Sequence, residues 1–366
     1  MTTTQEPTVP TEEEIGGFAE TMFGMALSTL ELTVMWLGRT LGLYAALRET
    51  PRGSTAPELA ARAAIDARYA REWLEHQAVA GVVTVDDPSA ASDERRFTLP
   101  EAHAVVLLDD EHPAYSGALA DIAPILARSL ELVPPAFRSG AGIAFAEYGL
   151  HDMQAGFTRP MFKASLVDEW LPALPDVHAR LEAGESLRVA DFGCGEGWAG
   201  IYIAEAYPNV TVDGFDLDDT SIAAARRNAA QRGVGDRVHF EVKDARNETL
   251  RGYDLVYSCE VIHDLADPVG VLASMQRVTG GAGAVLIIDE RAAEQFSPSG
   301  DPIERLLYAF SIIHCLPVGR TATESAATGT VMRPDVFTGY AKKAGFSSVE
   351  VLPVEHPVFR LYRLHH

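Results

Sequence analysis

Three aspartates near the ends of short apolar runs are the residues of this chain best suited to binding a ligand. Asp191 lies in LRVADF, Asp216 ends VTVDGFD, and Asp244 follows RVHFEVK. A carboxylate at a strand end can accept hydrogen bonds from both ribose hydroxyls, as we expect for Asp216, or from an adenine amino group, as we expect for Asp244. A lone aspartate after a strand is usually a turn or helix cap. Three of them after successive runs predict a nucleoside-binding site.

A glycine-rich segment, GCGEGWAG at 193–200, follows the first of these runs. Glycines let the backbone turn tightly and approach a ligand. The spacing of the glycines through Gly200 also fits a dinucleotide-binding pattern. The charge of the segment must therefore distinguish between the possible ligands. The segment is flanked by Asp191 and contains Glu196 but no Lys or Arg, which disfavours a pyrophosphate and suits a cation. S-adenosylmethionine carries an ammonium and a sulfonium and no phosphate, so it is the favoured cofactor, with a nicotinamide oxidoreductase as an alternative.

The elements that must position this site begin at Leu187, where short apolar strands start to alternate with helices. This order is typical of a parallel sheet covered by helices. A fourth strand covers 253–263 and a fifth covers 284–290. A helix over 334–344 and two strands, SSVEVLP and VFRLYRL, close the chain. The pattern predicts an α/β fold, a Rossmann-like, seven-stranded doubly wound sheet whose last strand is antiparallel.

The front half has the order of a winged helix. A helix over 56–63 can form a capping box between Thr55 and Glu58, a second helix covers 66–80, and two short strands follow. A helix that reads a DNA groove needs a positive face, whereas the second helix and the wing loop are net negative. We therefore interpret this mainly helical module as a dimerisation and substrate-covering domain.

The long apolar stretch before this module, 15–48, has helical periodicity. The most apolar part, Met22–Leu37, is short and includes Glu31, so it is interpreted as a buried core or dimer-interface helix and not as a membrane span. The domain organisation predicted from these patterns is a disordered tail (1–14), a winged-helix and dimerisation domain (15–110), a helical linker and substrate cover (111–183) and a cofactor-binding catalytic domain (184–366).

The overall composition fits a cytoplasmic enzyme. The chain has 30 basic and 52 acidic residues, a net charge of −22, which repels nucleic acid and anionic membranes. The three cysteines have no metal-like spacing, so we expect neither a metal site nor disulfides. No Lys or Arg precedes Arg39, so we expect no secretory signal.

The motifs DFGCGEG, GFD, KDA and VIHDL resemble those of class I S-adenosylmethionine-dependent methyltransferases. The front-half segments LGLYAAL, APELAARA and REWLEHQAVAGVV resemble the winged-helix dimerisation module of small-molecule O-methyltransferases in that class. The resemblance implies a homodimer and a small-molecule acceptor. The cofactor-binding residues predicted from the motifs and the strand ends are Asp191, Gly193, Cys194, Gly195, Gly197, Asp216, Leu217, Asp244, Ala245, Ser258 and Cys259.

The resemblance also implies a catalytic base. In the family a histidine of a His-Asp pair removes the acceptor proton, which matches His263-Asp264, and a glutamate at the end of the fifth strand helps to orient it, which matches Glu290. Leu265 replaces a common aromatic residue, which argues against the family's phenolic acceptors. If His263 only caps a helix, N- or C-methylation without a base, or a non-catalytic winged-helix regulator, remains open. The residues proposed to line the acceptor pocket are Tyr148, Met153, Phe157, Arg159, Tyr308 and His314.

Overall fold

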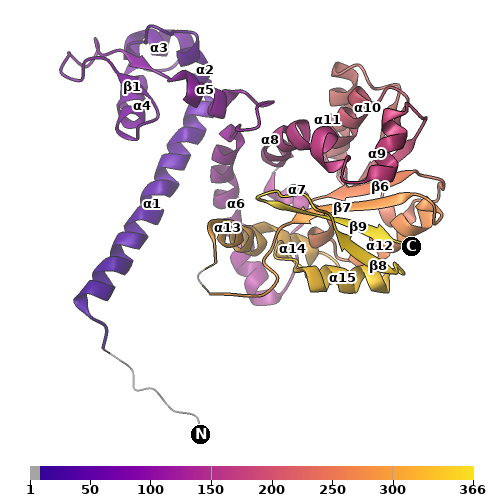
Figure 1. Ribbon diagram of the computed structural model, residues 1–366. Coiled ribbons are helices and arrows are strands. Elements are labelled where there is room, and N and C mark those ends of the chain that lie inside the picture. Colours follow the sequence, from indigo (N-terminus) through magenta and orange to yellow (C-terminus); the bar gives the residue numbers. More distant parts are fainter. Residues whose placement is uncertain (1–8, 150, 299) are drawn as a thin grey trace. The chain divides into compact units, whose positions relative to one another are not determined.

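The computed structural model describes residues 9–149, 151–298 and 300–366. Its N-terminal part is mainly helical, and its C-terminal part is an α/β structure (Figure 1). Two compact units are present. The first extends to Asp109 and includes Tyr115–Ala123, and the second comprises Asp110–Ala114 and Pro124–His366. Each unit is described by itself below.

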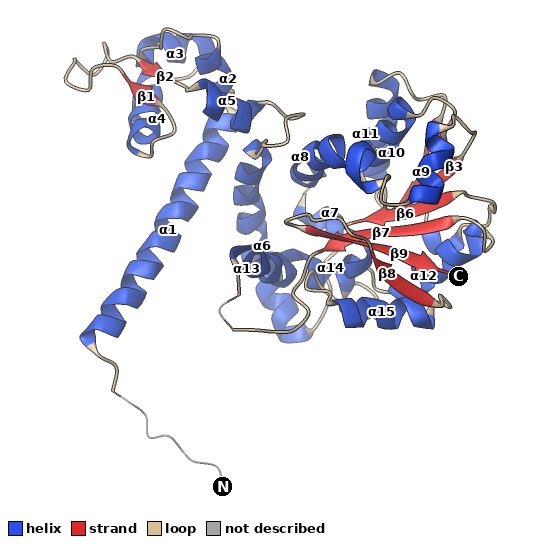
Figure 2. Cartoon of the chain, viewed as in Figure 1, coloured by secondary structure: helices blue, strands red, loops and turns tan. Residues whose placement is uncertain are grey.

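The second unit is built on one seven-stranded sheet, coloured red in Figure 2. The strand order is β5-β4-β3-β6-β7-β9-β8, and the first five of these strands are parallel. β9 lies antiparallel between β7 and β8, which confirms the predicted antiparallel insertion of the last strand. The strand bounds are β3 (Arg188–Phe192), β4 (Thr211–Asp216), β5 (Val238–Val242), β6 (Leu255–Cys259), β7 (Ala284–Glu290), β8 (Ser348–Val351) and β9 (Phe359–His365).

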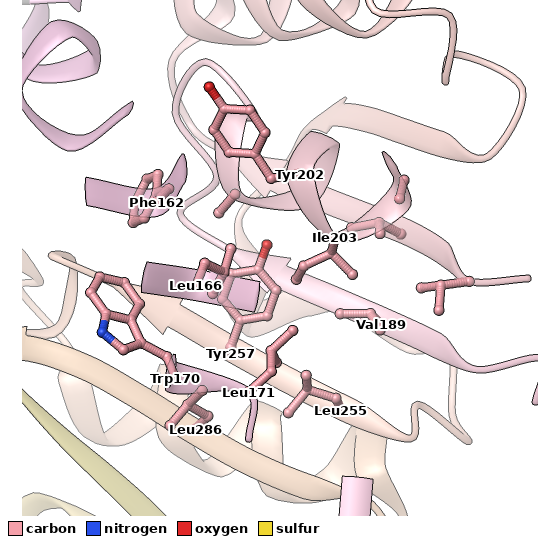
Figure 3. Close-up of a cluster of buried hydrophobic side chains, with 14 of the residues drawn as sticks. Phe162, Leu166, Trp170, Leu171, Val189, Tyr202, Ile203, Leu255, Tyr257 and Leu286 are labelled. Carbon is pink, nitrogen blue, oxygen red and sulfur yellow. The ribbon is translucent and has the colours of Figure 1, made fainter. Parts of the chain in front are cut away.

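Alternating side chains of the central strands fill two separate cores, one on each face of the sheet. On β6, Leu255 and Tyr257 belong to one core and Val256 to the other, as the period of two in a strand requires. Figure 3 shows the first core, in which Trp170 and Leu286 lie near Tyr257. Helices cover both faces, so the sheet is doubly wound. They are α9 (Pro175–Glu182), α10 (Trp198–Ala206) and α11 (Asp219–Gln231) on the first core, and α12 (Pro268–Thr279) and α15 (Pro334–Lys343) on the second.

The remaining helices of this unit precede the sheet or follow β7. A helix α8 (His151–Met161) continues into a π-helical segment, Phe162–Trp170, which packs against α10. The others are α6 (Ile122–Ser139), which starts at the boundary of the two units, α7 (Phe145–Tyr148), α13 (Pro302–Phe310), the π-helical segment Ser311–Cys315 and α14 (Leu316–Gly319).

The first unit has the predicted winged-helix order. Thr55 and Glu58 form the expected reciprocal capping box at the start of α3. Tyr44 donates a hydrogen bond of 2.6 Å to Gln77 in the buried core between α2 and α4. The elements are α1 (Glu12–Thr40), α2 (Leu43–Arg48), α3 (Ala56–Ala63), α4 (Ala67–Val79), β1 (Thr84–Val85), β2 (Phe97–Thr98) and α5 (Glu101–Leu108).

The long first helix departs from the expectation in two respects. It begins at Glu12, inside the segment expected to be a disordered tail, because Thr11 and Glu14 form a capping box; residues 1–8 lie outside the described part. Its apolar side chains are largely exposed, and Gly38 is the residue of α1 that is buried, so the expectation of a core helix is wrong for the single chain. α1 is also the one described helix whose length and composition would allow it to cross a membrane.

Candidate active site

A cavity of about 640 Å³ lies at the carboxyl ends of β3, β4 and β6. It contains most of the residues predicted to bind a cofactor. Two of the predicted residues, Gly197 and Ser258, are not on its wall. The predicted residues that line it are Asp191, Gly193, Cys194, Gly195, Asp216, Leu217, Asp244, Ala245 and Cys259.

The glycine segment is held tightly between its neighbours. Gly193 and Gly197 have φ angles of 81° and 79°, a left-handed conformation that favours glycine. A Cβ atom would overlap Val261 at Gly193 and the Phe240 ring at Gly197. Gly197 therefore acts through packing at the start of α10 and not through contact with the cavity.

The first two strand-end aspartates are held by hydrogen bonds, Asp191 in a buried position and Asp216 in a half-buried one. Asp191 is 2% exposed and accepts a hydrogen bond of 2.8 Å from the Tyr257 hydroxyl. Asp216 accepts backbone N–H groups from Gly195 and Asp218 at 2.9 and 3.0 Å. Burial raises the pKa of both carboxyls, that of Asp191 to about 7, and the Asp216 charge adds to the shift of Asp191. A cation bound nearby would favour their charged forms.

Basic side chains line the cavity as well, which the glycine segment alone does not reveal. Arg246 donates to both oxygens of Asp244, at 2.6 Å for the shortest contact, and these bonds lower the pKa of Asp244. Lys243 lies 2.9 Å from Glu248. Among the described residues, these are the Lys and Arg side chains on the cavity wall. Because both of these basic side chains are paired with carboxylates, acidic side chains dominate the charge of the wall.

His263 lies behind the cavity wall and not on it. It belongs to the 3₁₀ turn Ile262–Asp264 after β6 and is 3% exposed. Its Nδ1 is 2.6 Å from Asp289 Oδ1, and its Nε2 is 3.4 Å from Oδ1 of Asp264, which does line the cavity. Burial opposes the imidazolium, but the Asp289 and Asp264 charges outweigh it and raise the pKa of His263.

The structure corrects the prediction that Glu290 contacts and orients His263. Asp289, and not Glu290, is hydrogen-bonded to His263. Adjacent residues of a strand point to opposite faces, so only one of the two can reach the turn that follows β6. Glu290 is buried as well, and its Oε2 has no hydrogen-bond partner among the described residues.

Glu260 is a cavity residue that the sequence analysis missed. It follows β6, lines the cavity and has a φ angle of 56°. A positive φ is uncommon outside glycine and often marks a functional position. Its Oε1 is buried without a hydrogen-bond partner among the described residues, and burial raises its pKa to about 7. A carboxylate three residues before the histidine in EVIH was the available signal.

The six residues proposed for the acceptor pocket do not line this cavity. On α8 other residues line it instead, namely His151, Gln154, Ala155 and Thr158, followed by Phe162, spaced as one helical face. Met153 and Phe157 fall off that face. His151 lies 3.0 Å from Asp218.

The remaining proposed pocket residues have other partners. Arg159 lies over the Trp198 ring, 4.0 Å from its centroid, and pairs with Asp110 and Glu111. The Tyr148 and His314 rings pack edge to face, with centroids 4.8 Å apart. Tyr308 accepts a hydrogen bond of 3.1 Å from Arg333.

Two family models match the chain. Residues 183–307 match a methyltransferase domain, and residues 28–108 match the Rv2258c-like winged helix-turn-helix domain. Among curated relatives, acetylserotonin O-methyltransferase of Rattus norvegicus is 28% identical over 195 residues, which are 53% of this chain and 42% of that protein. The chain spans less than half the length of the curated relatives reported.

Solved structures resemble the chain over nearly its whole length. Human N-acetylserotonin methyltransferase in complex with SAM has a TM-score of 0.69 at 14% identity and covers 100% of this chain and 99% of its own. PigF with SAH has a TM-score of 0.71 at 20% identity, with 98% and 100% covered. At these identities the likeness concerns the fold. The chain thus combines an Rv2258c-like winged helix-turn-helix domain with a methyltransferase domain on the Rossmann-like fold of the S-adenosylmethionine-dependent methyltransferases.

Proposed function

We propose that this protein transfers a methyl group from S-adenosylmethionine to a small-molecule acceptor. The observation that carries the proposal is the acidic cavity at the glycine turn, where Asp191, Asp216 and Asp244 converge from three strand ends. A sulfonium with an ammonium group suits this wall better than a diphosphate does. The methyltransferase domain match and the structural neighbours with SAM or SAH support the same cofactor.

The chain's own residues would bind and orient the cofactor, which supplies the methyl group. Asp216 would accept hydrogen bonds from the ribose hydroxyls, and Asp191 would contribute a negative charge beside the glycine turn. Methyl transfer is an in-line displacement, so positioning and the exclusion of water supply most of the rate enhancement. The face of α8 that carries Thr158 would cover the bound molecules.

We assign removal of the acceptor's proton to three side chains in sequence of contact, Asp264, His263 and Asp289. Asp264 lines the cavity and lies between it and His263, so His263 would act through Asp264 on a hydroxyl acceptor. Asp289 would hold the imidazole in place. If His263→Ala keeps full turnover, the acceptor needs no base, and N- or C-methylation is the better assignment.

Calorimetry with S-adenosylhomocysteine and with NADH tests the cofactor. We expect binding of the first and none of the second. Asp216→Asn should weaken that binding at least tenfold, whereas Asp219→Asn, an exposed position on α11 that does not line the cavity, should leave it unchanged. Binding of NADH alone would refute the proposal.

A labelled-methyl transfer screen against a metabolite extract, with the product identified by mass spectrometry, tests the reaction and names the acceptor. Transfer to a small molecule supports the proposal. A chain that binds S-adenosylhomocysteine but labels no molecule in extracts of several sources would favour a non-catalytic regulator.

The exposed apolar face of α1 supports the proposed homodimer. Phe18, Phe23 and Leu30 are 65–70% exposed, and a monomer rarely leaves a contiguous apolar stripe of this length uncovered. We propose that a second copy of the chain covers it. Phe23→Glu with Leu30→Glu should yield monomers in light scattering, whereas Val79→Glu, an exposed position on α4, should not. A monomeric wild-type protein that floats with lipid vesicles would instead support membrane attachment.

A further inference from the structure

Glu260 has a backbone conformation that a glutamate does not favour. Its φ angle is 56°, and its N–H donates a hydrogen bond of 2.9 Å to the carbonyl of Ile288 on the neighbouring strand β7. Glycine would adopt this left-handed conformation without strain. Strained residues of this kind cluster at functional sites, where the surrounding structure holds them. The strain holds the Glu260 side chain on the cavity wall, between Cys259 and Val261, which also line it.

The Glu260 carboxylate has no positively charged partner of its own in the protein. Its Oε1 is buried and has no hydrogen-bond partner among the described residues. Burial raises the pKa of Glu260, and the charge on His263 offsets part of that shift. The His263 ring is already shared between two other carboxylates, since Nδ1 lies 2.6 Å from Asp289 and Nε2 lies 3.4 Å from Asp264. A buried carboxylate without a partner costs free energy.

Glu290 increases the excess of negative charge at this end of the sheet. Its Oε2 is buried and also has no hydrogen-bond partner within the described ranges. Burial raises the pKa of Glu290, and the Glu260 charge adds to the shift, so the two carboxyls oppose each other's ionisation. Lys243 and Arg246, the Lys and Arg of the described wall, follow β5 and are paired with other carboxylates. A bound cation would therefore supply what the protein lacks beside Glu260.

The sulfonium of the cofactor is the first cation to consider, and the reaction argues against it. In methyl transfer, on which this inference rests, the bond between carbon and sulfur breaks and its electron pair stays on sulfur, which becomes a neutral thioether. A buried carboxylate paired with the sulfonium would stabilise the reactants more than the transition state. It would also lose its partner in the product. A cation that belongs to the acceptor keeps its charge throughout.

We propose that Glu260 selects the acceptor, and that the acceptor carries a protonated amine that pairs with Glu260 Oε1. The amine is not the methylated atom, because a protonated nitrogen has no free electron pair with which to attack the methyl group. The methylated atom is a hydroxyl oxygen of the same molecule, whose proton passes to Asp264 and His263 as assigned above. The acceptor class is therefore a hydroxyl compound that also bears a basic amine. The same negative charge disfavours carboxylate and phosphate acceptors.

Three matched probes test this preference by binding alone, in a complex with saturating S-adenosylhomocysteine. Benzylamine, benzyl alcohol and benzoate share one ring and carry a positive, a neutral and a negative end group. Calorimetry should show that benzylamine binds the wild type about 10- to 100-fold more tightly than benzyl alcohol, the usual worth of a hydrogen bond to a charged group. Benzoate should bind most weakly.

Two variants locate the preference on the cavity wall. Glu260→Gln keeps the shape of the side chain and should bind benzylamine and benzyl alcohol with similar affinity. Glu324→Gln removes the same charge from an exposed position on the same wall and should keep the preference. The proposal is overturned if benzylamine does not bind the wild type, if it binds no better than benzyl alcohol, or if the preference persists in Glu260→Gln.

The two forms of the cofactor separate the acceptor from the sulfonium. Glu260→Gln should bind S-adenosylmethionine and S-adenosylhomocysteine as the wild type does, which also shows that the variant is folded. A loss for S-adenosylmethionine alone would assign Glu260 to the sulfonium, and an equal loss for both would assign it to the ammonium group; either result overturns the proposal. Glu260→Asn, which tolerates a positive φ, is the second variant if Glu260→Gln unfolds. A wild type that does not bind S-adenosylhomocysteine contradicts the methyltransferase proposal itself, so the two failures are distinguishable.

Discussion

The pH dependence of cofactor binding is expected to report on Asp191. Burial raises the pKa of this carboxyl to about 7 in the cofactor-free protein. Binding of a cation beside it favours the carboxylate, so the pKa falls in the complex. Below pH 7 the carboxyl must release a proton before the cation is bound, and the affinity for S-adenosylmethionine therefore decreases as the pH falls. Only well above pH 7 is this contribution complete.

The magnitude follows from the titration of one group. Each unit below the pKa of the free protein costs about 1.4 kcal/mol, a tenfold loss of affinity. Between pH 7.5 and pH 6.0 the dissociation constant should rise about eightfold, since one site with a pKa near 7 changes its charged fraction by that factor. Measurements stop at pH 7.5 because S-adenosylmethionine carries an α-amino group. Such a group loses its proton, and with it its positive charge, at about pH 7.7–8.0.

Two variants make the assignment specific. Calorimetric titration of Asp191→Asn should show weaker binding and lose most of the pH dependence. Tyr257→Phe removes the hydrogen bond to Asp191, worth about 1.5–3 kcal/mol to a charged acceptor. The midpoint should move upward by about 1–2 pH units, beyond the measured range, so between pH 6.0 and pH 7.5 the dissociation constant should change by the full factor of about ten per pH unit. Tyr253→Phe, whose hydroxyl donates to Asp213 instead, is the matched control. An unchanged pH profile in Asp191→Asn would refute the reasoning.

Two further predictions concern the orienting carboxylate and the glycine turn. Asp289→Asn should lower kcat of methyl transfer about 100-fold or more, as expected when proton removal is impaired. Glu290→Gln should have a much smaller effect. Steady-state kinetics with the identified acceptor measure both, and the reverse order would mean that Glu290 is the orienting residue. Gly197→Ala should destabilise the fold by about 2–4 kcal/mol in urea unfolding through backbone strain and overlap with Phe240. Gly233→Ala, with a φ of 71° and open space around it, should cost only the strain, and equal losses would contradict the packing argument.

The sheet and its strand-end aspartates could be predicted from the sequence because both depend on local patterns. Apolar runs separated by helices define the strands, and residues after successive parallel strands meet at one edge. Asp191, Asp216 and Asp244 accordingly line one cavity. The antiparallel last strand of the seven-stranded sheet followed from the closing helix and two strands.

The residue that orients His263 could not be predicted in the same way. All seven residues of β7 are buried, so the strand has no polar side to show which of Asp289 and Glu290 points toward the turn after β6. The cavity-lining residues of α8 could not be predicted for a related reason. Aromatic residues such as Phe157 were chosen by type, whereas the phase of the helix selects His151 and Thr158.

The exposure of α1 illustrates a different limit. Apolar periodicity shows that a helix face needs to be covered, but it does not show which molecule covers it. The same pattern therefore predicted a core helix, whereas Phe23 and Leu30 are exposed in the single chain.

The insertion of β9 between β7 and β8 links the active site to the order of synthesis. β7 carries Asp289, which pairs in the ladder with Arg360 of β9. During translation, one edge of β7 stays without its neighbour until residues 359–365 have left the ribosome, and open strand edges promote association between chains. A chain that stops before Phe359 would retain the glycine turn but expose the edge of the strand that positions His263.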